Sequence, residues 1–357
     1  MNNTRSDRYI RIMIRIFGAL LAAALPTGLF SACAFQDRKM YTSRLFAMDT
    51  VMELEVSGHE EVLAGAEEMI RDLEKELSVT DENSAIYALN NSGSGMLSSQ
   101  ALDILTRALG VCARTDGALD ISIYPVLRAW GFTTGQYHVP TDEEIDELLS
   151  SVDYGRIEVS SDNPSAARVT IPTGMQIDLG SVTKGYTSTA VADYFRQQGV
   201  TSALINLGGN VQCIGRKPDG SKWKVAIKSP FEDSSSGIYG VMEAEDTAII
   251  TSGGYERYFE EDGETYWHIL DPSTGYPAKS GLASVTVIGE DGLLCDGLST
   301  ALFVMGLEKA SDLWRNSDDF EAVFITEEGD VYITEGAADS FSLSGEYYDS
   351  KENVLHR

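Results

Sequence analysis

The chain has 357 residues, of which 55 are acidic and 27 are lysine or arginine, so its formal net charge is −28 at pH 7. This excess of negative charge repels polyanions and argues against nucleic-acid binding. Any phosphate that such a protein binds must be neutralised locally, by a metal ion or by a few well-placed basic residues. Hydrophobic residues make up 43% of the chain and charged residues 23%, which is ordinary for a globular protein.

The N-terminal segment has the pattern of a secretory signal. Residues 1–32 contain four arginines and one acidic residue, and an apolar run over 16–30 follows the last arginine. Two small residues then precede Cys33, as in a bacterial lipobox with Phe30 in place of the usual leucine. We expect Cys33 to be the lipidated N-terminus of an exported protein, anchored on the extracytoplasmic side of the cell membrane. Ordinary signal cleavage nearby is the alternative.

Beyond this segment, neither a clean linker nor an internal repeat divides the sequence. We therefore predict a signal peptide over 1–32, a tether over 33–44 and one folded domain over 45–350. The histidines are scattered, and the remaining cysteines lack the paired spacing of a zinc site. A bound metal is thus expected to be an oxygen-ligated ion such as Mg²⁺. These cysteines are Cys112, Cys213 and Cys295.

In the first half of the domain, the spacing of apolar residues predicts two long helices and several short strands. The helices are expected over 60–77 and 101–112. A capping box from Thr141 to Glu144 opens a shorter helix that ends near Ser150. The strands are expected over 50–56, 156–159, 169–171 and 175–179.

Between these elements, Trp130-Gly131-Phe132 places two large rings around a glycine. A glycine lets a ligand approach the backbone, so a planar aromatic ligand could lie between the rings. A buried aromatic corner is the alternative.

The stretch from Ile177 to Gly209 is the most informative part of the sequence. The strand expected over 175–179 runs into a helix from Ser181 to Gly199, with Gly180 at the turn. A helix N-terminus presents unpaired N–H groups and the positive end of its dipole, and Lys184 adds a full charge one turn in. These features favour an anion-binding site. The P-loop and G-x-G-x-x-G spacings are both absent, so a tight strand-to-helix connection is the alternative.

In the second half, His268 precedes a turn that is formed by Asp271 and Gly275. Its side chain could therefore be presented to a ligand, although a core histidine is an equal alternative. Further strands are expected over 203–207, 223–227, 248–251 and 283–288.

A helix is expected from Cys295 onward, and it contains Asp296 and Thr300. These two residues are four positions apart, so they lie on one face of the helix. A carboxylate and a hydroxyl in this arrangement can share one hard cation. The alternative is an N-terminal cap, because Asp and Thr are common in that role.

Together these motifs resemble the FAD:protein FMN transferase (ApbE) family from Met48 to about Gly306. The resemblance implies an α+β fold in which mixed sheets and packed helices form two interlocked lobes around the nucleotide. The segments that carry it are Asp178-Leu-Gly-Ser-Val-Thr-Lys184, the Leu-Gly-Gly that ends at Gly209, Thr251-Ser-Gly, His268-Ile-Leu-Asp-Pro-Ser-Thr-Gly275, and Asp296 with Thr300.

The resemblance implies an enzyme that binds FAD with Mg²⁺ and transfers the FMN half, through a phosphoester bond, to a Thr or Ser hydroxyl of a target protein. AMP would be released, and the target would be an exported or membrane redox protein. The metal would be held by the carbonyl of Ser181 with Asp296 and Thr300. His268 is the candidate general base, and Asp178 competes with it. FAD would be held by Met48, Trp130, Gly131, Phe132, Asp178, Lys184 and Leu270.

Two positions depart from the family pattern. Thr80 stands where many members have a tyrosine, which puts one flavin contact in doubt and with it the balance between transfer and hydrolysis. Asp49 replaces the usual glycine of Met-Gly-Thr and adds a negative charge near the phosphate site. Two alternative functions therefore stay open: an FAD pyrophosphatase that yields FMN and AMP, and a non-enzymatic flavin-binding lipoprotein.

Overall fold

The computed structural model describes residues 39–163 and 166–357. Lys39–Arg357 form one compact unit. The predicted signal peptide and Cys33 lie outside the described residues. Strand β1 already begins at Met40 and β17 ends at Leu355, so the folded domain extends beyond the predicted limits of 45 and 350 on both sides. None of the helices within the described ranges is long and apolar enough to cross a membrane.

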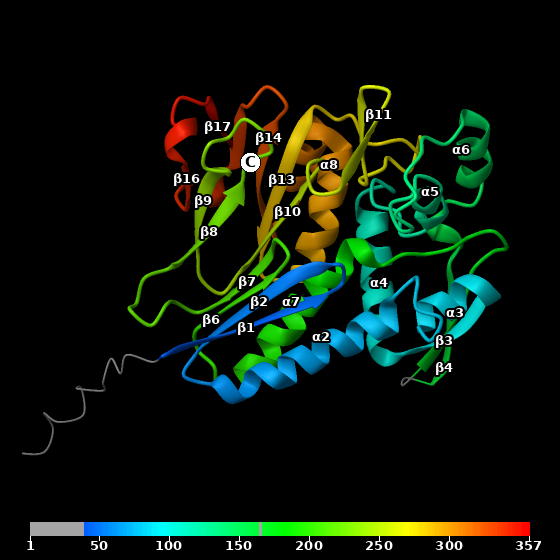
Figure 1. Ribbon diagram of the computed structural model, residues 1–357, viewed down its shortest axis with the longest axis horizontal. Coiled ribbons are helices and arrows are strands. Elements are labelled where there is room, and N and C mark those ends of the chain that lie inside the picture. Colours follow the sequence, from blue (N-terminus) through cyan, green and yellow to red (C-terminus); the bar gives the residue numbers. More distant parts are fainter. Residues whose placement is uncertain (1–38, 164–165) are drawn as a thin grey trace, which may run out of the picture. The chain divides into compact units, whose positions relative to one another are not determined.

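A nine-stranded sheet runs through the molecule in the order β1-β2-β6-β7-β10-β13-β14-β15-β17 (Figure 1). All neighbouring pairs are antiparallel except β15 and β17, which are parallel. Together with the helices, this confirms the α+β class. The strands are β1 (Met40–Ala47), β2 (Thr50–Ser57), β6 (Ala203–Leu207), β7 (Asn210–Ile214), β10 (Ala248–Gly253), β13 (Leu282–Gly289), β14 (Glu321–Thr326), β15 (Val331–Thr334) and β17 (Glu352–Leu355).

Four long helices build the main core with this sheet, and α8 packs on β10 and β13. Helix α2 buries the apolar stripe that its sequence predicts, after a 3-10 turn over Glu60–Val62. The two predicted lobes therefore belong to one unit rather than to separate domains. The helices are α2 (Leu63–Leu77), α4 (Ser99–Arg114), α7 (Gly180–Gln197) and α8 (Gly292–Arg315).

A second core covers the opposite face of the large sheet. Residues Val225 and Tyr239 of a small sheet pack there against Val211 and Val323 of the large one. The small sheet has the order β16-β9-β8. Its strands are β8 (Trp223–Lys228), β9 (Ile238–Ala244) and β16 (Phe341–Leu343), and the short helices α9 (Glu335–Ala338) and η3 (Gly345–Tyr347) follow β15 and β16.

The remaining elements lie around the helical core. The capping box of α6 is present as predicted, with Thr141 and Glu144 bonded reciprocally. These elements are α3 (Ala85–Ser92), β3 (Ser94–Ser98), α5 (Tyr124–Ala129), α6 (Asp142–Leu149), η2 (Tyr154–Arg156), β4 (Glu158–Asn163), β5 (Ala166–Thr170) and the hairpin of β11 (Tyr258–Glu261) and β12 (Glu264–Trp267).

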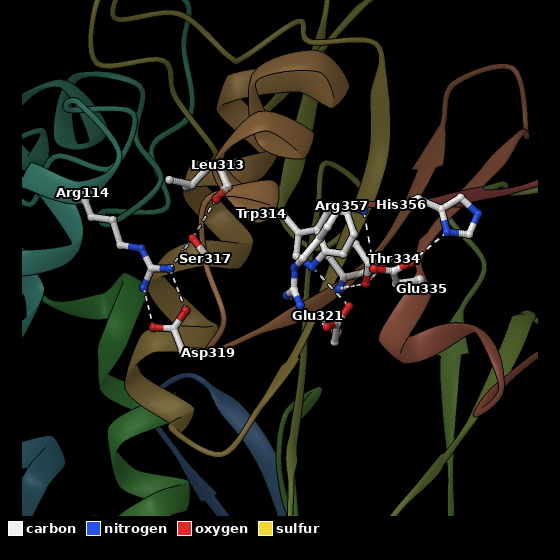
Figure 2. A network of polar contacts seen from close by, with 11 residues as sticks. Arg114, Leu313, Trp314, Ser317, Asp319, Glu321, Thr334, Glu335, His356 and Arg357 are labelled. Atoms are coloured by element: carbon white, nitrogen blue, oxygen red, sulfur yellow. Dashed lines mark hydrogen bonds and ion pairs between the residues drawn. The ribbon is translucent and has the colours of Figure 1, made fainter.

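Polar contacts fix the segments that follow α8 and β17 (Figure 2). Arg114 of α4 forms an ion pair with Asp319, with an N–O distance of 2.7 Å. The indole of Trp314 donates to Glu321 at 3.2 Å, and the Arg357 guanidinium lies 4.9 Å from the Trp314 ring centroid. The last residues of the chain are thereby held against the end of α8.

One predicted strand is wrong. Residues 175–179 join no sheet, and Leu179 already has the non-extended conformation of the α7 N-cap, with φ of −99° and ψ of 8°. The side chain of Asn90 instead donates to the carbonyl of Ile177 and accepts from its N–H, both at 2.8 Å. An amide side chain thus takes the place of a neighbouring strand, and the segment still leads into α7 as predicted.

Candidate functional site

Two glycines bring α7 and α8 into backbone contact at the centre of the candidate site. A Cβ atom on Gly185 would lie 2.1 Å from the carbonyl oxygen of Gly292, and a Cβ on Gly292 would lie 2.3 Å from the carbonyl oxygen of Gly185. Real Cβ atoms do not come so close to backbone atoms, so neither position accepts a side chain without moving a helix. This contact carries the first turns of α8 to the first turns of α7.

We expect Gly185→Ala to lower the thermal stability of the protein. The obstructing atoms are the carbonyl C and O of Gly292 and the Cβ of Asp296, none of which can rotate away. The helices must therefore separate, at a cost of roughly 1–3 kcal/mol that exceeds the helix-propensity gain of alanine. Gly110→Ala in α4 is the matched control, because a Cβ there meets nothing within 4 Å. Thermal unfolding of both variants checks the contact; equal stability of Gly185→Ala and the wild type would contradict it.

Asp296 lies on α8 at this contact, and only 5% of the residue is exposed. Its Oδ2 accepts a hydrogen bond from the N–H of Gly185 at 2.8 Å. In a regular helix the Gly185 N–H would donate to the carbonyl of Ser181, which is another predicted metal ligand. Asp296 therefore competes with the Ser181 carbonyl for the same N–H group. Burial raises the pKa of Asp296, which the nearby charge of Lys184 partly offsets.

The capping alternative for Asp296 is wrong. The N-cap of α8 is Asp291, whose side chain accepts from the N–H of Leu294 at 3.3 Å. Asp296 therefore lies one turn inside the helix, where no capping role explains a buried carboxylate.

Hydroxyl groups line the same region. Thr300 follows Asp296 by one turn of α8, and its Oγ1 lies 3.4 Å from the Oγ of Ser252 at the end of β10. The Ser252 hydroxyl also lies 2.7 Å from the Oγ of Ser299. Oxygen atoms of this kind suit a hard cation.

Asn210 at the start of β7 lies beside Asp296 and lowers its pKa. The residue is only 3% exposed, and the contact of its Nδ2 with the Asp296 carboxylate does not reach the geometry of a standard hydrogen bond. A buried donor that is held so weakly can turn to a ligand that supplies an acceptor. Phosphate oxygens are suitable acceptors.

The donor set fits a magnesium ion better than a transition metal. Within 39–163 and 166–357, no group of three or more His, Cys, Asp or Glu side chains could hold a metal. Asp296 would thus be the one carboxylate, beside neutral oxygens of Ser181 and Thr300. Mg²⁺ is commonly held by one or two carboxylates together with water and substrate phosphates.

Positive charge lies at the N-terminus of α7. Lys184 forms no ion pair within 4.0 Å among the described residues, and its charge lowers the pKa of Asp178 and of His268. The Oδ1 of Asp178 accepts from the N–H of Gly180 at 2.8 Å, so the first helical donor is already paired. Burial raises the pKa of Asp178. Lys184 is therefore the candidate anion-binding group of this turn.

His268 is half-buried and lies near Phe132, with ring centroids 6.3 Å apart. Its Nδ1 lies 3.2 Å from the carbonyl oxygen of Arg257, which can only accept, so Nδ1 carries the proton and Nε2 is a free base. Burial, and then the charges of Arg257 and Lys184, lower the pKa of His268 to about 3. The imidazole is therefore neutral at physiological pH.

A buried aromatic cluster contains Trp130, Phe132 and Leu270. This is the buried corner that the sequence analysis gave as the alternative to a ligand site between the rings. Trp130 is 0% exposed, and its indole N–H donates to the carbonyl of Gly275 at 2.8 Å. Its ring therefore offers no free face to a ligand in this structure. The space beside Gly131 is filled by the chain and not by a ligand, because a Cβ there would lie 2.2 Å from the carbonyl oxygen of Gln136.

Met48 lies in a two-residue turn between β1 and β2, and both Met48 and Asp49 have positive φ, 48° and 58°. Aspartate tolerates this conformation, which explains Asp49 as a turn residue. The N–H of Met48 donates to Glu74 of α2 at 2.6 Å. Thr80 is exposed just beyond the end of α2, so Met48 and Thr80 lie at the same helix end.

Sequence analysis missed two residues of this site. Arg257 donates to the carbonyl of Phe132 at 2.9 Å and adds positive charge beside His268. Nothing in its polar surroundings distinguishes it in the sequence. Asn210 could have been found, because it directly follows the Leu-Gly-Gly segment that carries the family resemblance.

Comparisons with known proteins identify the family of this chain. The model of the ApbE family matches residues 48–324. A Klebsiella pneumoniae protein named FAD:protein FMN transferase is 33% identical over 302 residues, which cover 84% of this chain and 93% of that protein. An Escherichia coli protein of the same name is 33% identical over 263 residues, covering 72% of this chain and 74% of its own length.

Solved structures agree as well. The ApbE protein of Thermotoga maritima matches with a TM-score of 0.77 and 31% identity, over 85% of this chain and 99% of that one. The flavinyl transferase ApbE of Pseudomonas stutzeri matches with a TM-score of 0.71 and 30% identity, over 86% and 94%. The chain that carries this α7–α8 site is a member of the ApbE family.

Proposed function

We propose that this protein transfers the FMN moiety of FAD to a Thr or Ser hydroxyl of a target protein, in a magnesium-dependent reaction that releases AMP. The observation that carries the proposal is the buried Asp296 carboxylate, which accepts from the Gly185 N–H at the α7–α8 contact and is near enough to the charge of Lys184 for that charge to lower its pKa. A cation site beside a fixed positive charge is what a strongly acidic protein needs in order to bind a pyrophosphate.

Within this proposal, Asp296, Thr300 and the carbonyl of Ser181 hold the ion. Bound there, Mg²⁺ would neutralise charge on the pyrophosphate. Lys184 and the amide of Asn210, which Asp296 holds only weakly, donate to the phosphate oxygens. Phosphoryl transfer depends mostly on such positioning and electrostatic stabilisation, so these residues account for most of the catalysis.

The acceptor hydroxyl attacks the phosphorus of the FMN half, and the bond between the two phosphates breaks to release AMP. The proton of the hydroxyl passes to Nε2 of His268, or to Asp178 as the competing base. His268 is a weak base while its pKa is about 3. The negative charge of bound FAD favours the protonated imidazole, so nucleotide binding raises this pKa toward a useful value.

Hydrolysis of FAD is the second candidate, because exposed Thr80 leaves the flavin with one contact fewer than a tyrosine would give. The ratio of products separates the two reactions. Purified protein is incubated with FAD and Mg²⁺, with and without an acceptor domain, and AMP and free FMN are measured. We expect the acceptor to increase AMP release without an equal amount of free FMN. Equal amounts in both cases would favour hydrolysis, and no AMP would favour the flavin-binding lipoprotein.

We also propose export and lipid anchoring at Cys33, supported by the charge and hydrophobic pattern of residues 1–33. Native protein should label with fatty acid and sediment with membranes. Cys33→Ala should abolish the label and release or mislocalise the protein, with FAD chemistry unchanged in vitro. Ala34→Ser is the matched control and should stay anchored. A native N-terminus other than residue 33, without lipid, would refute the anchor.

A further inference from the structure

A pocket of about 570 Å³ lies between the β11–β12 hairpin and the connection from β8 to β9. The hydroxyl of Tyr258 in the hairpin donates to Glu232 in the connection at 3.3 Å, which links the two walls. The connection is itself held in place, because Glu346 accepts hydrogen bonds from the hydroxyls of Ser234 and Ser235 at 2.6 and 2.8 Å. The pocket is thus bounded by fixed chain segments.

The hairpin separates this pocket from the aromatic cluster. Successive residues of a strand point to opposite faces. Phe259 and Tyr266 are paired in register and pack beside Trp130, with ring centroids 6.3 and 5.2 Å from it. The neighbouring pair, Tyr258 and Trp267, faces the other way and lines the pocket. None of the residues that the family resemblance implies for FAD lines it.

The pocket lies next to the proposed metal ligands. Phe303 lines it and is three residues after Thr300 on α8, so the two side chains are neighbours on one helix face. Gly254 also lines it and is two residues after Ser252, whose Oγ lies 3.4 Å from Thr300 Oγ1. A molecule in the pocket would therefore lie about one helical turn from Thr300, a proposed metal ligand.

Hydrogen-bond donors and acidic side chains define what this pocket can bind. The Tyr255 hydroxyl and the Trp267 indole N–H are buried without a partner. Such donors suit the carbonyl groups of a polypeptide backbone. The rim carries Glu232, Glu260 and Glu327, against one lysine, Lys228. This charge disfavours a diphosphate and favours an uncharged or basic segment.

We propose that this pocket docks the target protein, by binding an extended, uncharged or basic segment that flanks the hydroxyl to be modified. The inference rests on the proposed function, and it assigns the acceptor to the face of the hairpin that is opposite to the aromatic cluster. The segment's carbonyls bond to Tyr255 and Trp267, and its hydroxyl residue extends past Phe303 toward Thr300.

Two exposed pocket residues test this by different means. Glu260→Lys reverses charge at the rim, and Thr265→Trp fills the pocket from β12. The matched control is Glu261→Lys, which has the same charge change on the opposite face of the same hairpin. The acceptor is a purified domain that the Escherichia coli relative flavinylates. We expect each pocket variant to raise the KM for this domain by about tenfold or more and to leave the KM for FAD unchanged. The control Glu261→Lys should change neither KM.

An unchanged KM for the acceptor in both variants would overturn the docking site, and a raised KM for FAD alone would show that the pocket binds the nucleotide. Affinity for the acceptor domain, with its modified hydroxyl residue changed to valine, is also measured by calorimetry. This measurement needs no turnover. A wild-type enzyme that transfers no FMN contradicts the proposed function. Equal affinity of the wild type and Glu260→Lys for the acceptor domain contradicts the docking site, whether or not FMN is transferred.

Discussion

Asp296→Ala should reduce FMN transfer by roughly 10²-fold or more, because it removes the one carboxylate of the proposed metal site and leaves phosphate charge unneutralised. The measurement is steady-state turnover with saturating FAD and Mg²⁺. Asp312→Ala is the matched control on the same helix: it removes an exposed carboxylate that pairs with Arg315 at 2.8 Å near the far end of α8, and it should keep near-normal turnover. Near-normal turnover of Asp296→Ala would show that the metal assignment is wrong.

The buried Asp296 carboxylate should lower the stability of the metal-free protein, and this effect can be measured. Burial raises the pKa of Asp296 in the folded protein, so the ionised carboxylate destabilises the fold above its ordinary pKa. Asp296→Asn should therefore raise the melting temperature of the metal-free protein at pH 7. The gain should disappear as the pH falls below about 4, where the carboxyl is protonated in both the folded and unfolded states. A destabilised Asp296→Asn in EDTA at pH 7 would contradict the expected cost.

His268→Ala should lower turnover by roughly 10²- to 10⁴-fold while FAD still binds, because a positioned general base contributes about that much. The measurement is single-turnover transfer at saturating FAD, together with FAD affinity by fluorescence. His138→Ala is the control, since that histidine is exposed and lies outside the site. If FAD affinity collapses while turnover at saturation is unchanged, His268 is a binding residue and the proton passes to Asp178, to another carboxylate or to water.

The pH dependence of wild-type turnover gives a second test of His268. A base is lost as the pH falls through its pKa, and the pKa of His268 is about 3 before nucleotide binds. The acid limb of kcat/KM, which reports the free enzyme, should therefore lie below pH 5. The acid limb of kcat should lie at higher pH, because bound phosphate raises the pKa. Identical limbs would argue against His268 as the base.

Local patterns predicted the regular elements well. The apolar stripe of α2 and the capping box of α6 are properties of short stretches, and both are present in the structure. The strand over 175–179 failed for a non-local reason, since Asn90 satisfies its backbone from a position 87 residues away. The β11–β12 hairpin was missed although its Asp262-Gly263 turn, with φ of 51° and 82°, is a strong hairpin signal.

The site was predicted in parts rather than as a whole. Motifs identified Asp296 and Lys184, but the sequence does not show that Gly185 and Gly292 bring their helices together. Packing likewise decides that Trp130 is buried, because the residues around it come from distant parts of the chain. Proximity between distant segments is the information that periodicity and motif spacing do not contain.

The most direct test of FMN transfer is the intact mass of an acceptor domain after incubation with this protein, FAD and Mg²⁺. The predicted result is a mass gain of one covalently bound FMN with an equal amount of AMP. No gain is expected with Asp296→Ala enzyme, or with an acceptor whose modified Thr or Ser is replaced by valine. An acceptor of unchanged mass, with free FMN and AMP accumulating or with FAD left intact, would contradict the proposed transferase.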